Sequence, residues 1–274
     1  MKINCVIVTY NRLSLLKECI SALKNQTYKI NKIYIINNNS TDGTSDYLQE
    51  LIADSQFVII NLPQNIGGAG GFSEGIKRVV LDGCDWAWIM DDDTIPMNNA
   101  LEELVKGTTV TKNVGYVCSR VVWTDGMIHK MNIPRFDCEN KQHLPINYYS
   151  NLADVLLIRA ASFVSLLINS KAVREVGLPI KEFFIWGDDT EFTTRIYQHG
   201  YVCLYASQST VIHKTTENYI SQLQNAPVEA LWKFQYGFRN DIFLRRMRKK
   251  NFLFFISVIN AYRRAVRHLS LIHI

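Results

Sequence analysis

Residues 85–96 read DWAWIMDDDTIP, an apolar run that ends in three consecutive carboxylates and then a proline. The apolar residues 86–90 predict a strand buried on both faces, and the loop after such a strand is where open α/β sheets bind ligands. Alternate residues of an extended chain point the same way, so Asp91 and Asp93 can converge on one cation while Asp92 points elsewhere. The stretch is either a divalent-metal site for a phosphorylated ligand or an acidic, solvated loop tip. Carboxylates at a strand end favour the metal.

Upstream of this stretch, short apolar runs alternate with segments of helical periodicity. Each run ends in a polar or glycine-rich loop, and Ser14 is expected to cap the first helix. The alternation predicts an α/β fold of Rossmann type with a mainly parallel central sheet. Strands are expected at residues 3–9, 32–36 and 57–62, and helices at 14–25, 44–52 and 73–81.

The second half of the chain is less regular. Residues 124–149 have no clear period, and we expect a long loop or hairpin there that lies over the site. Strands are expected at residues 116–123 and 202–206, strand-like runs within 155–168, and helices at 101–105, 170–176 and 189–199.

The chain has 274 residues, of which 47% are hydrophobic, so it can build one large domain with a sizeable core. Its six cysteines form no C-x-x-C pair, which predicts reduced thiols in a cytosolic protein and no zinc site. We expect no signal peptide, and no run reaches the ~18 apolar residues that a membrane span needs.

The charge is concentrated at the C-terminus. Residues 228–274 hold ten Lys/Arg and two Asp/Glu interleaved with aromatics, which gives net +8, against −3 for residues 1–227. We therefore divide the chain into a domain at 1–227 and a basic, aromatic helical extension at 228–274. The extension is either an interfacial membrane segment or a helix with a solvated basic face, and nucleic-acid binding is a third, less favoured option.

A glycine cluster formed by Gly67, Gly68, Gly70 and Gly71 separates a predicted strand from a predicted helix. It matches neither G-x-G-x-x-G nor a P-loop, but four glycines in five residues allow the backbone to approach a flat or anionic ligand. The acidic run also fails to match the D-x-D-x-T signature of haloacid-type phosphatases, because the threonine position falls at Ile95.

A second acidic cluster, Asp188 and Asp189, lies at a predicted helix start and could be an N-cap alone. A second acidic pair is also what a metal-dependent transfer enzyme requires, because carboxylates that hold a cation are poor bases. His213 follows an apolar run, and it is either a metal ligand or a core histidine.

Taken in order, these motifs resemble the family 2 glycosyltransferases, whose fold is called GT-A. The resemblance covers roughly residues 3–215 and rests on the stretches VTYNR (8–12), NNSTDGT (38–44), DDD (91–93) and WGDDTEF (186–192), with His213 downstream. The stretches NIGGAGGF (65–72) and YGFRN (236–240) are similar to those of the galactofuranosyl- and rhamnosyltransferase branch. Asn37 stands where many members have an aspartate that meets the nucleobase, which leaves the choice of nucleotide open.

The resemblance implies a nucleotide-diphosphate sugar donor, with UDP-galactofuranose as the best candidate and dTDP-rhamnose as the alternative. It implies Mn²⁺ or Mg²⁺ held by Asp91 and Asp93, with His213 as a possible third ligand. The residues expected to bind the donor are Thr9, Tyr10, Arg12, Asn38, Gly67, Gly68, Gly70 and Asp92.

On the acceptor side, the resemblance implies that Asp189 takes the proton of the attacking hydroxyl, and that Asp188 and Trp186 position the acceptor. A single displacement inverts the anomeric configuration. The expected acceptor is a growing cell-surface glycan, free or lipid-linked, at the inner face of the cell membrane. The competing interpretation is a non-catalytic module that binds a nucleotide or glycan, which would have no need of both acidic clusters.

Overall fold

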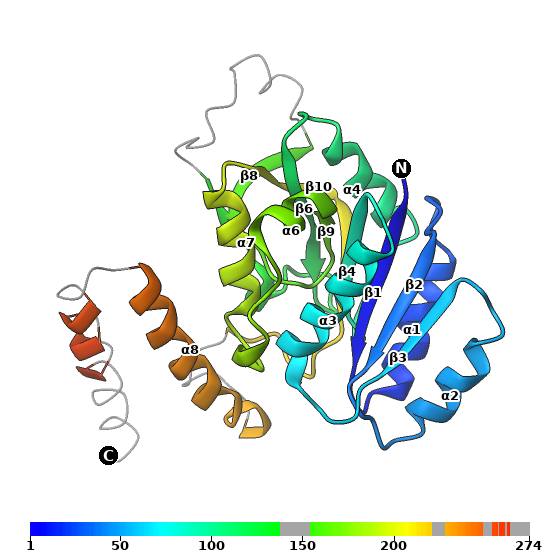
Figure 1. Cartoon of the computed structure of the whole chain (residues 1–274), viewed down its shortest axis with the longest axis horizontal. Helices are drawn as coiled ribbons and strands as arrows, with labels where there is room; N and C mark the ends of the chain where they lie inside the picture. Colours follow the sequence, from blue (N-terminus) through cyan, green and yellow to red (C-terminus); the bar gives the residue numbers. More distant parts are fainter. Residues whose placement is uncertain (138–153, 221–227, 249–253, 257, 261, 264–274) are drawn as a thin grey trace.

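The computed structural model describes residues 1–137, 154–220, 228–248, 254–256, 258–260 and 262–263. In this part of the chain, ten strands form one twisted sheet with helices on both faces (Figure 1). The α/β fold and mainly parallel sheet predicted from the alternation of elements are confirmed. The strands are β1 (Ile3–Thr9), β2 (Lys32–Asn37), β3 (Phe57–Asn61), β4 (Trp86–Asp91), β5 (Thr94–Pro96), β6 (Val114–Val122), β7 (Arg135–Phe136), β8 (Val155–Ala160), β9 (Leu166–Asn169) and β10 (Val202–His213).

The strand order is β3-β2-β1-β4-β9-β6-β10-β8-β7, and β5 pairs with β10. Strands β1 to β4 are parallel, with β1 between β2 and β4. The exception at the centre of the sheet is β9, which runs antiparallel to both neighbours, β4 and β6. Because β1, β2 and β4 are parallel, the loops at their carboxyl ends meet at one edge of the sheet.

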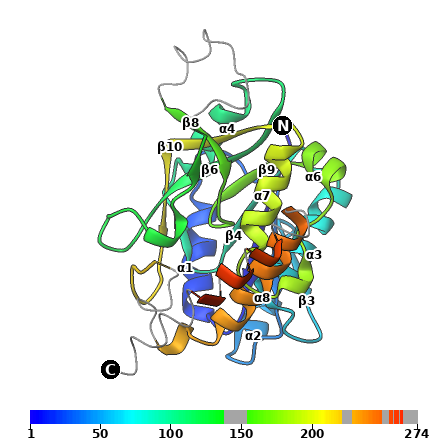
Figure 2. The ribbon, with the colours of Figure 1, turned by 90° about the vertical axis from the view of Figure 1, so that its left-hand side faces the viewer.

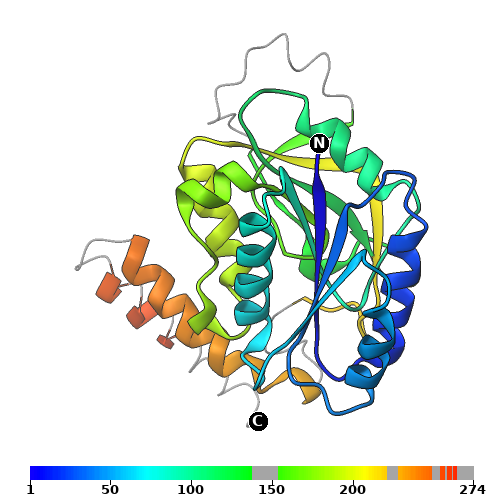
Figure 3. The same cartoon turned by 45° about the vertical axis from the view of Figure 1, so that its right-hand side comes forward.

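The helices cover the two faces of the sheet as two layers, each with its own core (Figure 3). Alternate side chains of β1 show the division, because Ile7 packs in the core under α1 and Val8 in the core under α3. One layer consists of α1 (Leu13–Lys24), α2 (Thr44–Leu51) and α4 (Ala100–Thr108), and the other of α3 (Gly67–Leu81), α6 (Ser170–Val176) and α7 (Asp188–Gln198).

The glycine cluster belongs to a helix, and the prediction of a loop before a helix at 73–81 is wrong. Helix α3 already begins at Gly67. A Cβ on Gly71 would lie 2.5 Å from Val8 Cγ1, and one on Gly67 would lie 2.1 Å from the carbonyl oxygen of Phe184. The glycines therefore let α3 pack closely on β1 and on the segment before α7. Gly68 is the exception within the cluster, because a Cβ on this residue would meet no atom within 4 Å.

The predicted cap of α1 is also wrong. The helix begins at Leu13, and the Leu13 amide donates to Asp42 Oδ2 at 3.0 Å, so the cap comes from the loop after β2. A carboxylate at this helix start also favours the helix dipole. This contact ties together the two loops that follow β1 and β2.

The last described long helix, α8 (Lys233–Arg248), crosses in front of α3 and α7 in Figure 2, and its Leu244 packs with Ala69 at the start of α3 and with Phe183 before α7. Of the predicted loop at 124–149, the described part holds a short 3₁₀ turn at Lys130–Asn132 and strand β7, and the remainder lies outside the described residues. No helix in the described ranges is long and apolar enough to cross a membrane.

Candidate active site

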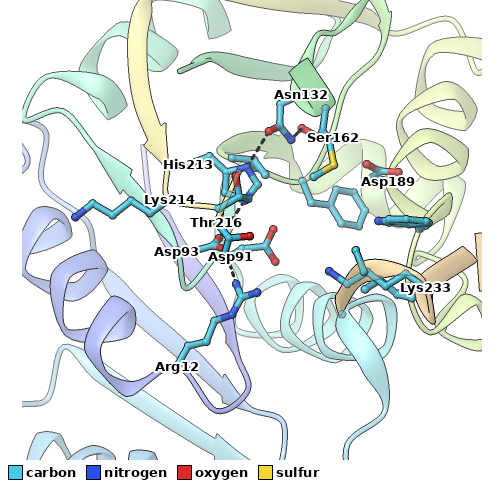
Figure 4. A pocket seen from close by; sticks show the side chains of 18 of the residues that line it. Arg12, Asp91, Asp93, Asn132, Ser162, Asp189, His213, Lys214, Thr216 and Lys233 are labelled. Atoms are coloured by element: carbon cyan, nitrogen blue, oxygen red, sulfur yellow. Dashed lines mark hydrogen bonds and ion pairs between the residues drawn. The ribbon is translucent and has the colours of Figure 1, made fainter. Parts of the chain in front are cut away.

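A cavity of about 570 Å³ opens at the carboxyl end of β4, between the sheet and the start of α7 (Figure 4). Eight of the residues singled out in the sequence line it: Arg12, Gly68, Asp91, Asp93, Trp186, Asp188, Asp189 and His213. The two acidic clusters are almost a hundred residues apart in sequence, and the fold brings both to this one cavity.

Three potential metal ligands meet on one wall of the cavity. One ligand atom from each of Asp91, Asp93 and His213 lies within 4.8 Å of the other two. Ligands that surround one small divalent cation at about 2.1 Å lie up to roughly 4.2 Å apart, so slight side-chain adjustment brings all three onto one ion. Oxygen and imidazole ligands together suit Mn²⁺. We call this group the acidic triad.

The orientation of His213 supports a cation at the acidic triad. Its Nδ1 lies 2.8 Å from Asn132 Oδ1, which can only accept, so Nδ1 carries the proton. The other ring nitrogen, Nε2, then presents its lone pair to Asp93 Oδ1 at 3.2 Å. That carboxylate oxygen is buried and has no hydrogen bond with correct geometry. Two facing lone pairs require a shared metal ion or a second proton on the ring.

The electrostatics of the triad agree with this geometry. Burial lowers the pKa of His213, but the adjacent Asp93 and, less strongly, Asp91 raise it, and the net shift of the pKa is upward. Burial raises the pKa of Asp91 to about 6, and the charge of Asp93 adds to the effect. The cavity is therefore short of positive charge near Asp91, and a divalent cation would stabilise both ionised carboxylates.

Asp92 points away from the triad, as predicted, and organises the loop after β1. It accepts hydrogen bonds from Thr9 Oγ1 at 2.7 Å, from the Tyr10 amide at 3.3 Å and from Arg12 Nη1 at 3.3 Å. Arg12 also pairs with Asp93. Of the predicted donor-binding residues at this loop, Arg12 lines the cavity, whereas Thr9 and Asp92 hold the loop in place and the Tyr10 side chain is exposed.

Asn38 has a similar internal role. It is 2% exposed, its Oδ1 accepts from the Ile66 amide at 2.9 Å, and its Nδ2 donates to the Gly67 carbonyl at 3.0 Å. Asn37 is likewise engaged by the neighbouring side chains of Ser45 and Asn61. The Asn38 amide fastens the end of β2 to the start of α3, the Asn37 amide fastens it to α2 and β3, and neither residue lines the cavity.

Asp189 faces the triad from the start of α7 (Figure 4), and Asp188 beside it lines the same cavity. Asp188 is buried, and Asp189 accepts a hydrogen bond from the Thr190 amide. Burial raises the pKa of both carboxyls, and for Asp188 the neighbouring charge of Asp189 adds to it. A carboxylate with a raised pKa is a better proton acceptor near neutral pH, which suits Asp189 to general-base chemistry.

The backbone before this pair is held by α8. Phe184 and Trp186 have φ of 64° and 65°, a region that non-glycine residues seldom adopt. Asn240 Nδ2 lies 3.0, 3.1 and 2.7 Å from the carbonyl oxygens of Phe183, Ile185 and Trp186, and Arg239 Nη2 donates to the carbonyls of Glu182 and Phe183. The YGFRN motif thus fixes the segment that carries Asp188 and Asp189.

Sequence reasoning did not find two residues that line the cavity, Asn132 and Lys233, or the buried His129. Asn132 orients His213, and His129 stacks on the same ring with centroids 4.5 Å apart. Burial and the charge of His213 lower the pKa of His129 to about 4, so its ring stays neutral. Lys233 enters the cavity from the first turn of α8. None of the three stands in a motif, and only the fold brings them to the site.

A model of the family described as Glycosyl transferase family 2 matches residues 5–177, more than half of the chain. The chain belongs to glycosyl transferase family 2. This membership confirms the family predicted from the ordered motifs, and with it the expectation of a glycosyltransferase that uses a nucleotide-sugar donor.

Curated relatives of this family 2 chain include two mycobacterial galactofuranosyltransferases named GlfT1. The protein of Mycolicibacterium smegmatis is 26% identical over 213 residues, which are 74% of this chain and 68% of the relative. The protein of Mycobacterium tuberculosis H37Rv is 24% identical over 209 residues, or 71% of this chain and 64% of the relative. The chain thus spans about two thirds of the length of these relatives.

Solved structures with a similar fold include GalNAc-T7 with UDP, GalNAc and Mn²⁺, with a TM-score of 0.63 at 16% identity over 78% of this chain and 44% of that one. The mannosyltransferase PcManGT from Pyrobaculum calidifontis, in complex with GDP-Man and Mn²⁺, gives a TM-score of 0.55 at 16% identity over 81% of this chain and 58% of that one. At this identity the likeness supports the GT-A fold alone.

Proposed function

We propose that this protein is an inverting, metal-dependent glycosyltransferase that moves a sugar from a nucleotide diphosphate to a hydroxyl of a glycan. The observation that carries the proposal is the meeting of the acidic triad and Asp189 in one cavity of a family 2 chain. A non-catalytic binding module would have no use for a second carboxylate with a raised pKa opposite a potential metal site.

Asp91, Asp93 and His213 would hold Mn²⁺ or Mg²⁺, which supplies a Lewis acid for the departing diphosphate. Arg12, which lines the same wall, adds a fixed positive charge beside Asp93. Asp189 takes the proton of the acceptor hydroxyl as that oxygen attacks the anomeric carbon, so the configuration inverts. Asp188 and Trp186 shape the acceptor side of the cavity.

Substitution of Asp189 tests the mechanism. Asp189→Asn keeps the volume and removes the proton acceptor, so we expect transfer to fall by about 10²- to 10⁴-fold while donor affinity stays nearly unchanged. Asp93→Ala is the matched variant on the metal wall, and it should instead weaken both metal and donor binding. Near-normal turnover of Asp189→Asn would mean that another group is the base.

For the donor we propose UDP-galactofuranose, because the named relatives in two mycobacteria are galactofuranosyltransferases. The alternative donor is dTDP-rhamnose, because the NIGGAGGF stretch (65–72) is similar to that of a branch which includes both galactofuranosyl- and rhamnosyltransferases. A hydrolysis and transfer screen of UDP-galactofuranose, UDP-galactose, UDP-glucose and dTDP-rhamnose, with Mn²⁺ and with chelator, decides between them. Turnover of a hexopyranose donor alone would overturn the assignment of galactofuranose.

We further propose that the acceptor glycan is presented at a membrane surface that α8 contacts. Helix α8 exposes Phe238, Ile242 and Met247 as well as basic residues, a composition typical of interfacial helices. Ile242→Ser with Met247→Ser should reduce binding to vesicles that contain anionic lipid and leave turnover of a water-soluble acceptor unchanged. Equal vesicle binding by the double variant would contradict this contact.

A further inference from the structure

Lys233 is the first residue of α8, and its half-buried side chain lines the cavity. In Figure 4 its amino group points into the cavity, towards Asp91, from the wall that also carries Asp189. The donor's diphosphate would lie between the acidic triad and this wall. The position of Lys233 therefore raises the question of what its charge interacts with.

Within the part of the chain that the structure describes, Lys233 Nζ has no hydrogen bond or ion pair, and its recorded contact is with the Trp232 ring, 5.9 Å from the centroid. Glu229 is four residues earlier and lines the same cavity, but it does not pair with this lysine. The other cations of the lining are engaged: Arg12 by Asp92 and Asp93, and Lys214 by Glu18. Lys233 is thus available to a ligand.

Protein stability does not explain a lysine at this position. A positive charge in the first turn of a helix is unfavourable, because the amides there already form the positive end of the helix dipole. Burial lowers the pKa of Lys233, and Arg12 lowers it further, whereas Asp91 and Asp93 oppose the shift. A costly, unpaired cation that faces a substrate cavity is characteristic of a ligand-binding group.

The charges of the cavity indicate which ligand. On the metal side of the cavity, a divalent ion and Arg12 would balance the three carboxylates Asp91, Asp92 and Asp93, so a bound diphosphate would still need a positive partner. In an inverting displacement the sugar lies between Asp189 and the leaving diphosphate. Of the two phosphates, the one bonded to the sugar is therefore the nearer to the side of the cavity from which Lys233 enters.

We propose that Lys233 binds the sugar-linked phosphate of the donor and stabilises the diphosphate as it leaves. This inference rests on the proposed function. When the acceptor oxygen bonds to the anomeric carbon, the bond from that carbon to the phosphate oxygen breaks and its electron pair goes to the diphosphate. The ammonium of Lys233 meets that new charge, and Asp189 takes the acceptor's proton. Because α8 also fixes the segment before Asp189, one helix serves the donor and the acceptor sides.

The test compares Lys233→Met and Lys233→Gln with Lys214→Met. The Lys214 side chain points away from the cavity in Figure 4 and pairs with Glu18, so its substitution removes an equal charge near the site but not one that faces the cavity. Calorimetric titrations with UDP, UMP and inorganic diphosphate are made in the presence of Mn²⁺. We expect both Lys233 variants to bind UDP and diphosphate about 10- to 100-fold more weakly, because a hydrogen bond to a charged group is lost.

UMP lacks the second phosphate, so its affinity should change by at most about threefold in the same variants, and Lys233→Arg should restore most of the UDP affinity. Lys214→Met should bind all three probes as the unsubstituted protein does. If both neutral Lys233 variants bind diphosphate as tightly as the unsubstituted protein does, the proposal is wrong even though transfer persists. If no donor is turned over, the proposed function fails, while the diphosphate titration still decides the role of Lys233.

Discussion

Asn240 offers the sharpest test of how α8 supports the site. Its side chain is 1% exposed and lies within 3.1 Å of three backbone carbonyl oxygens in the strained segment before α7. Asn240→Ala removes about two net hydrogen bonds, because the amide has two protons, and leaves buried carbonyls without a donor. At about 1–2 kcal/mol for each, the free energy of unfolding should fall by about 2–4 kcal/mol. For a chain of this size, that corresponds to a drop in Tm of roughly 5–15 °C.

Urea denaturation and steady-state kinetics of Asn240→Ala measure both effects. Release of the positive φ at Phe184 and Trp186 should move Asp189, so kcat should fall at least about tenfold while KM for the donor changes little. Gln235→Ala is the matched control, because Gln235 is exposed on the same helix and its loss should cost under about 0.5 kcal/mol. An unfolding free energy of Asn240→Ala within about 0.5 kcal/mol of the unsubstituted protein would refute this reasoning.

Three further outcomes follow from the packing and the charges. Gly71→Ala would place a Cβ 2.5 Å from Val8 Cγ1 and should cost about 1–3 kcal/mol in urea denaturation, whereas Gly68→Ala, with nothing within 4 Å, should cost less than about 1 kcal/mol. Burial raises the pKa of Asp91 to about 6 in the folded protein, so the folded state favours the protonated carboxyl. The stability that this gives the metal-free protein is present below the unfolded pKa and is lost as pH rises from about 4 to 6. In the presence of Mn²⁺ the free energy of unfolding should no longer decline over this range. Because the pKa of Asp189 is raised, kcat/KM should fall on acidification at a pH above the ordinary range of an aspartate, and a pH–rate profile that is flat down to about pH 4 would contradict its role as the base.

Much of the sheet could be predicted from the sequence, because the residue pattern within each segment is enough to identify it as a strand or a helix. Buried parallel strands such as Trp86–Asp91 read as continuous apolar runs, and the helices between them show one apolar face each. The convergence of Asp91 and Asp93 also follows from the period of a strand. The position of β9, antiparallel between β4 and β6, could not be predicted from the sequence pattern, since strand order depends on contacts between distant segments.

The errors have the same origin. Ser14 has a side chain that often caps helices, but the contact at the start of α1 comes from Asp42, 29 residues from Leu13. The glycine cluster has the composition of a loop, yet contacts with Val8 and with the backbone of Phe184 make it the closely packed start of α3. In both cases a tertiary contact overrides the local preference.

The candidate site shows the same limit. The carboxylates of both clusters can be recognised in the sequence by their residue type and by their position after a strand or before a helix. Asn132 and Lys233 are ordinary residues of a loop and of a basic segment, and only the fold shows that one orients His213 and that the other enters the cavity.

The most direct test of the account is anomalous diffraction from crystals grown with Mn²⁺ and UDP. We expect a single strong manganese peak between Asp91, Asp93 and His213 Nε2, with the diphosphate bound to the ion on the side that faces Asp189. Manganese at another position, or a diphosphate bound away from the acidic triad with no metal beside it, would contradict the central claim.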